Sequence, residues 1–448
     1  MVRDCVLVFL LLCSGLSKAE VIYIDNTDAL NSQLSNAQPY DHLILASGIY
    51  RGQFVVDKPL SISSESNSEV IIDAGGKGSA VTITAPDVDV SGLSIRNWGN
   101  DHYEKDSGIR LLEGADRANI NHNQFQGDGF GISADSLSHL TIVGNIIIGN
   151  AELYFLDRGD GIYLLNVVSP SVSGNHISKV RDGVYLETGN FSRVFDNQFS
   201  ELQYGIHYMY THSDEAFNNV SRNVEGGYAL MSSKSIYLHH NRVSHALDFG
   251  ILLNMTSLCL IESNEAEHVI NPSEQVDLGR EGKGIFIYGA KDNIVWNNLF
   301  GQNDIGIYMA MGGEGNRVFE NRFIGNQSQV KYVGEALLEW SYNERGNYWS
   351  SNQAWLGAGS DVSQKAYRPN DNLDRLFWLY PEASFLMDSP IILLLRWGQK
   401  EFDVVEETGI VDSFPLLISS KISGFINEQG HRIVKDGMVA GSGYVYGC

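Results

Sequence analysis

Two thioethers, an imidazole and a carboxylate recur at a regular spacing in the middle of the sequence. Glu187, Met209 and Met231 each stand four residues after a glycine, and those glycines are 22 residues apart. His207 stands two residues after the same glycine as Met209. If each interval forms one coil of strands stacked about 4.8 Å apart, the four side chains meet on one outward face. Thioethers and imidazoles suit Cu(I) better than calcium or magnesium, so these four residues are candidate ligands for transiently bound Cu(I).

The same region also admits structural interpretations. A loop or a C-terminal segment covering this face would make Met209 and Met231 ordinary packing residues. Asp160 and Asp182 precede successive glycines and are expected to stack. Paired carboxylates serve as acid and base in polysaccharide hydrolases and epimerases. An aspartate before glycine more often caps a turn, however, and we favour that interpretation, with a neighbouring arginine offsetting the charge.

Other chemical signatures are weak. His212 and the pair His239-His240 fall near expected turns and are interpreted as surface residues. No GxSxG, HExxH, P-loop or CxxC arrangement occurs, so nothing supports a serine hydrolase, zinc protease, nucleotide-binding or dithiol function. The net charge of −23 argues against nucleic acid or an anionic membrane surface as the main partner.

Two markers with a common period indicate the elements that position these residues. The first is a glycine followed by alternating apolar residues, at Gly108, Gly131, Gly161, Gly183, Gly205, Gly227, Gly250, Gly284 and Gly306. The second is an asparagine, at Asn123, Asn145, Asn175, Asn197, Asn219, Asn241, Asn264, Asn298 and Asn321. Most gaps are 22 or 23 residues, and both markers share longer gaps of 30 and 34. We therefore predict an all-β fold, a right-handed parallel β-helix of roughly 22-residue coils.

Each coil is expected to bury alternate residues of its strand. Positions one and three after the glycine are apolar and should form the core, while positions two and four should face outward. The asparagines should form an internal amide ladder without a catalytic role. The longer gaps place loops near Asn150–Gly159 and Ile270–Gly282, beside the central coils, where partners commonly bind.

The ends of the chain differ from the repeat. Arg3, the apolar run Val6–Leu12 and a small-residue cleavage site ending at Ala19 have the pattern of a secretory signal, so we expect a periplasmic protein. After cleavage Cys259 and Cys448 remain, and Cys259 is most simply interpreted as a buried core thiol. The predicted organisation is a signal peptide at 1–19, the β-helix at 20–350, a capping or docking segment at 351–418 and a tail at 419–448.

The predicted segment 351–418 is expected to be short, mostly irregular and partly helical. An aromatic-rich cap precedes and enters it, marked by Trp340, Tyr348, Trp349 and Trp355. Pro381 begins a predicted helix that ends near Arg396. That helix either shields the last coil or docks on another subunit.

Several segments resemble the NosD family of periplasmic β-helix proteins. The most specific is Tyr204-Gly-Ile-His-Tyr-Met-Tyr210. The others are RGDGIY at 158–163, RDGVY at 181–185, ALM at 229–231, RGNYW at 345–349, SPIILLLR at 389–396 and DSFPL at 412–416. The likeness runs from the signal to about Leu417, with departures at 350–355 and after 417.

This resemblance implies a non-enzymatic copper-binding assembly factor that helps to mature the copper–sulfide centre of nitrous oxide reductase. Its implied partners are an ABC-type ATPase and membrane permease, a copper chaperone lipoprotein and the reductase, with no nucleic acid. Met209, Met231 and His207 would hold Cu(I), and Glu187 would assist its transfer. Two alternatives stay open: a polysaccharide lyase, epimerase or hydrolase of β-helix type that uses Asp160 and Asp182, and a passive binding scaffold.

Overall fold

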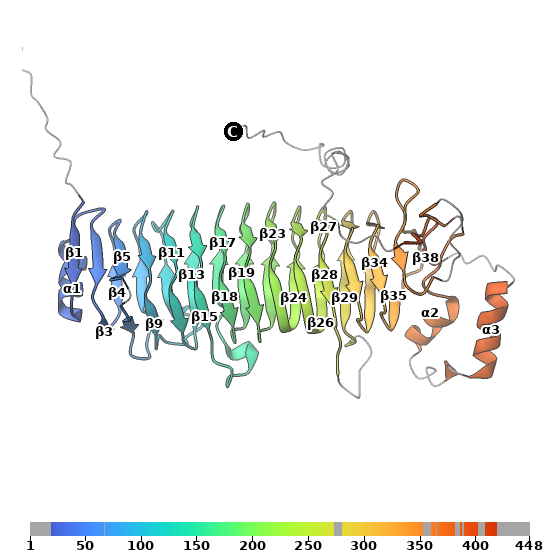
Figure 1. The fold of residues 1–448 in the computed structure, drawn as a ribbon, viewed down its shortest axis with the longest axis horizontal. Coiled ribbons are helices and arrows are strands. Elements are labelled where there is room, and N and C mark those ends of the chain that lie inside the picture. The colour runs from blue at the N-terminus through green and yellow to red at the C-terminus, as the bar shows by residue number, and fades with distance from the viewer. Residues whose placement is uncertain are drawn as a thin grey trace, which may run out of the picture.

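The computed structural model describes residues 19–66, 68–272, 280–352, 360–363, 365–380, 386–387, 389–401 and 408–418. The predicted signal peptide, apart from its last residue, lies outside these residues, as do the predicted tail and Trp355. Within them the chain forms the predicted right-handed parallel β-helix, a long stack of coils with the N-terminus at one end and two helices at the other (Figure 1).

One sheet of the described chain has 13 parallel strands, and we call it the β25 sheet. In stacking order its strands are β1 (Val21–Ile24), β2 (His42–Leu45), β5 (Ser61–Ser64), β8 (Asp89–Ser91), β11 (Asn119–Asn121), β14 (Thr141–Val143), β17 (Ser171–Ser173), β20 (Arg193–Phe195), β23 (Glu215–Phe217), β25 (Tyr237–His239), β27 (Leu260–Glu262), β30 (Ile294–Trp296) and β33 (Arg317–Phe319).

A second sheet has 23 strands within the described residues. The strands that carry the predicted outward columns form one row of it, the β22 row: β16 (Ile162–Leu165), β19 (Asp182–Glu187), β22 (Tyr204–Met209), β24 (Val220–Met231), β26 (Arg242–Asn254), β29 (Lys283–Ala290), β32 (Ile305–Gly312) and β35 (Ser328–Tyr332). Shorter strands such as β18 (His176–Ser178) and β21 (Gln198–Ser200) form the neighbouring row.

The glycine marker exists because the core leaves no room for a side chain there. A Cβ on Gly183 would collide with the Phe199 ring, and Gly205 faces Ser221 and the backbone of the next coil. The residues one and three places later are buried as predicted, for example Ile206 and Tyr208 at 0% exposure. Alternation therefore directs the even positions outward, where they line up from coil to coil.

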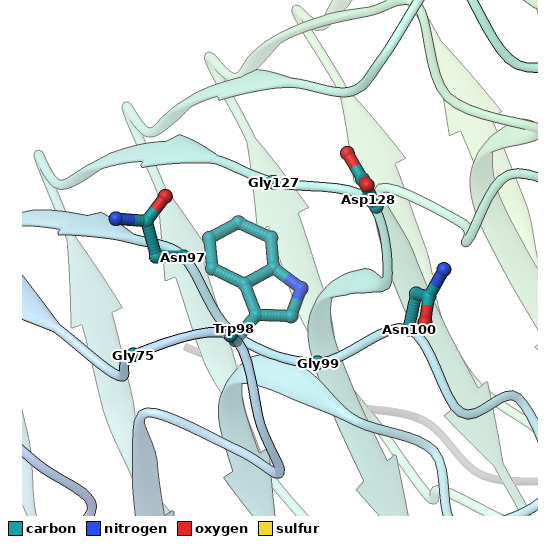
Figure 2. A pocket seen from close by; sticks show the side chains of 8 residues that line it. Gly75, Asn97, Trp98, Gly99, Asn100, Gly127 and Asp128 are labelled. Carbon is teal, nitrogen blue, oxygen red and sulfur yellow. The ribbon is translucent and has the colours of Figure 1, made fainter.

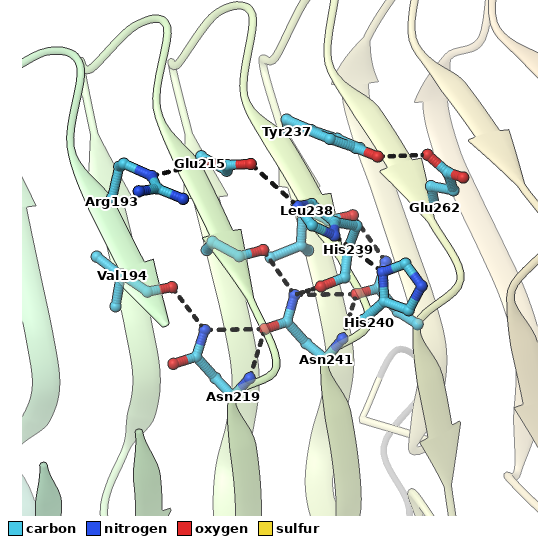
Figure 3. Close-up of polar contacts among 12 residues, drawn as sticks. Arg193, Val194, Glu215, Asn219, Tyr237, Leu238, His239, His240, Asn241 and Glu262 are labelled. Carbon is cyan, nitrogen blue, oxygen red and sulfur yellow. Dashed lines mark hydrogen bonds and ion pairs between the residues drawn. The ribbon is translucent and has the colours of Figure 1, made fainter. Parts of the chain in front are cut away.

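The predicted asparagine ladder is present and holds successive coils together. The side-chain oxygen of Asn219 accepts hydrogen bonds from the backbone N–H (3.1 Å) and side-chain amide (3.0 Å) of Asn197. Its own amide donates to the Val194 carbonyl and to the Asn241 side chain (Figure 3). The ladder continues past Asn321 to Asn347, one coil beyond the predicted series.

Both ends of the stack are covered. Helix α1 (Thr27–Asn36) buries Leu30 and Leu34 at the N-terminal end. At the other end the Trp349 ring stacks on Phe323 at 4.3 Å, and Trp340 is also buried, which confirms an aromatic cap. Covering the end coils protects their unpaired strand edges from other chains.

One carboxylate joins two segments that are far apart in the sequence. Asp412 accepts hydrogen bonds from the Asn347 backbone N–H at 2.7 Å and from the Trp349 indole at 2.8 Å. Burial raises the pKa of Asp412 to about 6. The RGNYW and DSFPL segments therefore close the solenoid together.

The predicted helix Pro381–Arg396 is only partly right. Helix α3 spans Pro390–Glu401 and is preceded by helix α2 (Asn372–Leu379), which the sequence did not indicate. Residues 381–385 lie outside the described chain. The Arg396 guanidinium ties the two helices together, at 2.8 Å from Asp371 and 2.7 Å from Asp374. Among the described residues, no helix has the length and apolarity to cross a membrane.

Candidate functional site

Strand register places the predicted outward residues in two columns on the β22 row. Two residues after the glycine the column runs Tyr163, Tyr185, His207, Ala229 and Leu252. Four residues after the glycine it runs Leu165, Glu187, Met209, Met231 and Asn254. The structure therefore brings Met209 and Met231 onto directly paired positions of neighbouring strands, with Glu187 one coil before Met209.

The surroundings of Met209 and Met231 are compatible with both predicted roles, as packing residues and as Cu(I) ligands. Met209 and Met231 are each half-buried. Met231 packs against a small apolar cluster on this face, formed by Ala229, Phe249 and Leu252. Half-buried thioethers next to an apolar patch are shielded from bulk water but still reachable, which suits a soft metal ion better than a hydrated one.

His207 is the most enclosed member of the group, with 9% of its surface exposed. Its Nδ1 lies 2.9 Å from a carboxylate oxygen of Asp182, and the Tyr185 ring stacks on it at 4.5 Å. Tyr204 packs perpendicular to it at 5.4 Å. Because a carboxylate accepts the Nδ1 proton, Nε2 retains its lone pair, and that buried atom has no hydrogen-bond partner.

Glu187 is engaged on the side away from the methionines. It accepts a 2.9 Å hydrogen bond from the hydroxyl of Tyr163 in the preceding coil. Burial and the nearby carboxylate raise the pKa of Tyr163, so the phenol stays protonated and keeps donating. Glu187 is half-buried and stands next to Met209, where a negative charge attracts a cation.

Each of the two stacked aspartates pairs with a basic side chain. Asp160 is fully buried and receives two hydrogen bonds from the Arg181 guanidinium, at 2.9 and 2.7 Å, so the arginine that offsets its charge comes from the next coil and not from the neighbouring position 158. Burial raises the pKa of Asp160 and Arg181 opposes that rise. Asp182, also buried, pairs with His207 instead. Neither carboxylate presents a free oxygen to a sugar substrate.

The structure brings together a second pair of methionines whose proximity was not predicted from the sequence. Met255 and Met311 are 52% and 47% exposed, and both lean over Gly289. The Met255 sulfur lies 3.1 Å, and the Met311 methyl carbon 3.5 Å, from the point where a Cβ of Gly289 would stand. The insertion before β29 and irregular pairing with β32 hide this proximity in the sequence. By contrast Met309 is fully buried in the core.

The histidines near the turns differ from one another. His212 and His240 are exposed, as expected, but His239 is not an open surface residue. Its ring is stacked between Tyr237 and Phe217. Cys259 is buried, and burial raises the pKa of its thiol to about 12, so it is an inert core residue at neutral pH.

A hollow of about 430 Å³ lies away from these columns, on turns of earlier coils. Gly75, Asn97, Asn100, Gly127 and Asp128 line it around the edge of Trp98 (Figure 2). Only 4% of Trp98 is exposed, so the hollow presents amides, the Asp128 carboxylate and peptide groups rather than an aromatic face for stacking a sugar.

Comparison with known proteins identifies the family. A family model described as "Periplasmic copper-binding protein (NosD)" matches residues 152–354, the coils that carry both columns. A protein of Stutzerimonas stutzeri named "Probable ABC transporter binding protein NosD" is 39% identical over 376 residues, covering 83% of this chain and 86% of the relative. The chain belongs to the NosD family. A NosD of Pseudomonas aeruginosa with the same printed name is 41% identical over 375 residues, covering 83% and 87%.

Solved structures share the fold of this NosD family member at low identity. A family 28 exopolygalacturonase of Yersinia enterocolitica is 11% identical with a TM-score of 0.53, over 70% of this chain and 78% of the enzyme. A DFA-IIIase of Arthrobacter chlorophenolicus is 14% identical with a TM-score of 0.52, over 69% and 95%. These similarities concern the β-helix alone.

Within the described residues, no group of three or more His, Cys, Asp or Glu side chains is arranged to hold a metal ion. A copper site on this face would therefore depend on the thioethers of Met209 and Met231. The donor types fit Cu(I), which accepts thioether and imidazole ligands at low coordination number.

Proposed function

We propose that this protein is a non-enzymatic copper carrier that binds Cu(I) transiently and supplies it to the copper–sulfide centre of nitrous oxide reductase. One observation carries the proposal: two half-buried thioethers on paired strand positions, Met209 and Met231, beside His207, whose Nε2 has no partner. The description of the family as periplasmic and copper-binding supports it. We further propose that residues 1–19 direct export to the periplasm.

The arrangement suits delivery better than permanent storage. Met209, Met231 and His207 provide only three donors, and thioethers are neutral, so a bound Cu(I) is held without strong charge pairing. Asp182 fixes the His207 ring in the tautomer that leaves Nε2 free to ligate. Because Tyr204 packs against that ring, we expect its side chain to turn aside when copper enters. Glu187 then attracts the incoming cation next to Met209.

We propose an ABC-type ATPase and membrane permease as partners, with a copper chaperone lipoprotein as donor and the reductase as acceptor. The relatives are named ABC transporter binding proteins. Helix α3 supports docking rather than capping, because five of its large apolar side chains are at least 50% exposed: Ile391, Leu393, Leu394, Leu395 and Trp397. A patch of this kind on a helix fixed to α2 by Arg396 is typical of a protein-binding surface.

The decisive experiment is an anaerobic Cu(I) titration of the mature protein against a competing chelator. The wild type is compared with a Met209→Ala/Met231→Ala variant and with a matched Met255→Ala/Met311→Ala variant. We expect one Cu(I) equivalent that only the first variant loses, with unchanged circular dichroism in both. Loss in the second variant alone would move the copper site to the pair over Gly289. No binding by the wild type would refute a copper-carrying role.

A further inference from the structure

His239 and His240 converge at the edge of the β25 sheet, on a different sheet from Met209 and Met231. His239 ends strand β25 and His240 begins the turn into the asparagine ladder. The Nδ1 atoms of the two rings lie 2.9 Å apart (Figure 3). Two nitrogens at this distance share one proton or can bind one metal ion.

The His239 ring is held in place on every side. It stacks on Tyr237 at 4.0 Å and on Phe217 at 5.1 Å, and its side chain is 14% exposed. Its Nε2 lies 3.2 Å from Glu215, whose other carboxylate oxygen accepts a 2.9 Å hydrogen bond from Arg193. The His239 side chain loses little conformational entropy when it binds a ligand, because packing already fixes the ring.

The contact with Glu215 also orients the His239 imidazole. The Glu215 carboxylate accepts the Nε2 proton of His239, so the Nδ1 of His239 carries a lone pair that faces His240. A carboxylate behind a histidine is the usual way in which proteins orient and strengthen a metal-binding imidazole.

We propose that His239 and His240 form a second metal site, for a divalent copper ion, with Glu215 as a positioning residue. With metal–nitrogen bonds of about 2.0 Å, nitrogens 2.9 Å apart subtend about 90° at the metal, the angle between neighbouring ligands in tetragonal Cu²⁺ sites. A tetrahedral zinc site would need them about 3.3 Å apart. Water or a partner protein fills the remaining positions, since the pair supplies two donors.

This site is independent of the proposed Cu(I) station. It uses two imidazoles on the β25 sheet, whereas the station uses two thioethers and the His207 imidazole on the β22 row. Cu²⁺ that reaches the protein already oxidised would meet two nitrogen ligands, which suit that ion, while Cu(I) would meet the two thioethers. The chain would thus bind the two oxidation states at separate places.

The test uses the full mature chain without a polyhistidine tag, with Cu²⁺ alone as the probe. Binding is followed by calorimetry and by electron paramagnetic resonance, which resolves splitting from coordinated nitrogens. His240→Asn is the main variant, because Asn218 and Asn297 occupy the equivalent turn position with the same left-handed backbone, φ 55° and 56° against 55° for His240. His122→Asn is the matched control, since exposed His122 holds that position (φ 53°) in an earlier coil.

We expect His240→Asn to lose one Cu²⁺ equivalent and its nitrogen splitting, and His122→Asn to keep both. Glu215→Gln should keep the site but weaken it by about tenfold or more. The Met209→Ala/Met231→Ala variant should bind Cu²⁺ as the wild type does, whatever the outcome for Cu(I). Unchanged Cu²⁺ binding in folded His240→Asn, or an equal loss in His122→Asn, would overturn the proposal.

Discussion

Replacing Asp214 by asparagine is expected to stabilise the coils that carry Met209 and Met231. Asp214 lies between strands β22 and β23 and is 2% exposed. Its side chain accepts a 2.7 Å hydrogen bond from the Ser192 backbone N–H. Asn293 fills the same place three coils later and accepts the equivalent bond from Cys259 at 2.9 Å. Asparagine therefore fits this position without the buried charge.

The size and pH range of the effect follow from the carboxylate. Burial raises the pKa of Asp214 from 3.8 to about 6, against hydrogen bonds from Ser192 and Thr211. The folded state thus binds more protons than the unfolded state between those values, and wild-type stability falls as pH rises from about 4 to about 6. At about 1.4 kcal/mol for each pKa unit, the ionised side chain costs up to about 3 kcal/mol above pH 6.

Urea unfolding from pH 3.5 to 7.5 tests this reasoning, with Asp196→Asn as a control that removes a charge from an exposed turn. Asp214→Asn should have a higher urea midpoint of unfolding than the wild type at pH 7. This difference in midpoint, the gap, should close below pH 4. The control should show no comparable gap. A gap that stays constant with pH, or a variant less stable at pH 7, would show that burial of the charge is not what limits stability.

Three further results are expected. Asn219→Ala should lower the free energy of unfolding by about 3 kcal/mol, because it strands buried backbone groups, whereas exposed Asn100→Ala should have little effect in the same urea assay. Arg181→Ala should cost about 3–5 kcal/mol at pH 7 by leaving Asp160 buried and unpaired, and the loss should shrink in acid, as thermal unfolding at pH 4 and 7 would show. Leu394→Asp should reduce co-purification with the permease and ATPase at least tenfold while leaving the Cu(I) titration unchanged.

Most of the fold was predictable because a β-helix repeats one set of local constraints. Each coil needs a glycine where the core is narrowest, apolar residues at alternate positions and an asparagine for the ladder, and all three are visible in the sequence. The C-terminal end was less predictable. Helix α2 and the start of α3 follow no repeat, and the contact between Asp412 and Asn347 joins residues 65 positions apart.

The sequence by itself determined which side chains form the two outward columns of the β22 row. Period-two alternation and a constant coil length fix which side chains face outward and which are neighbours, so Glu187, Met209 and Met231 line up as predicted. Only the tertiary structure decided which partner each side chain contacts. Asp182 orients His207 from the preceding coil, and Met255 meets Met311 across a glycine beyond an insertion. Such contacts depend on rotamers and on irregular loops, which a repeat period does not encode.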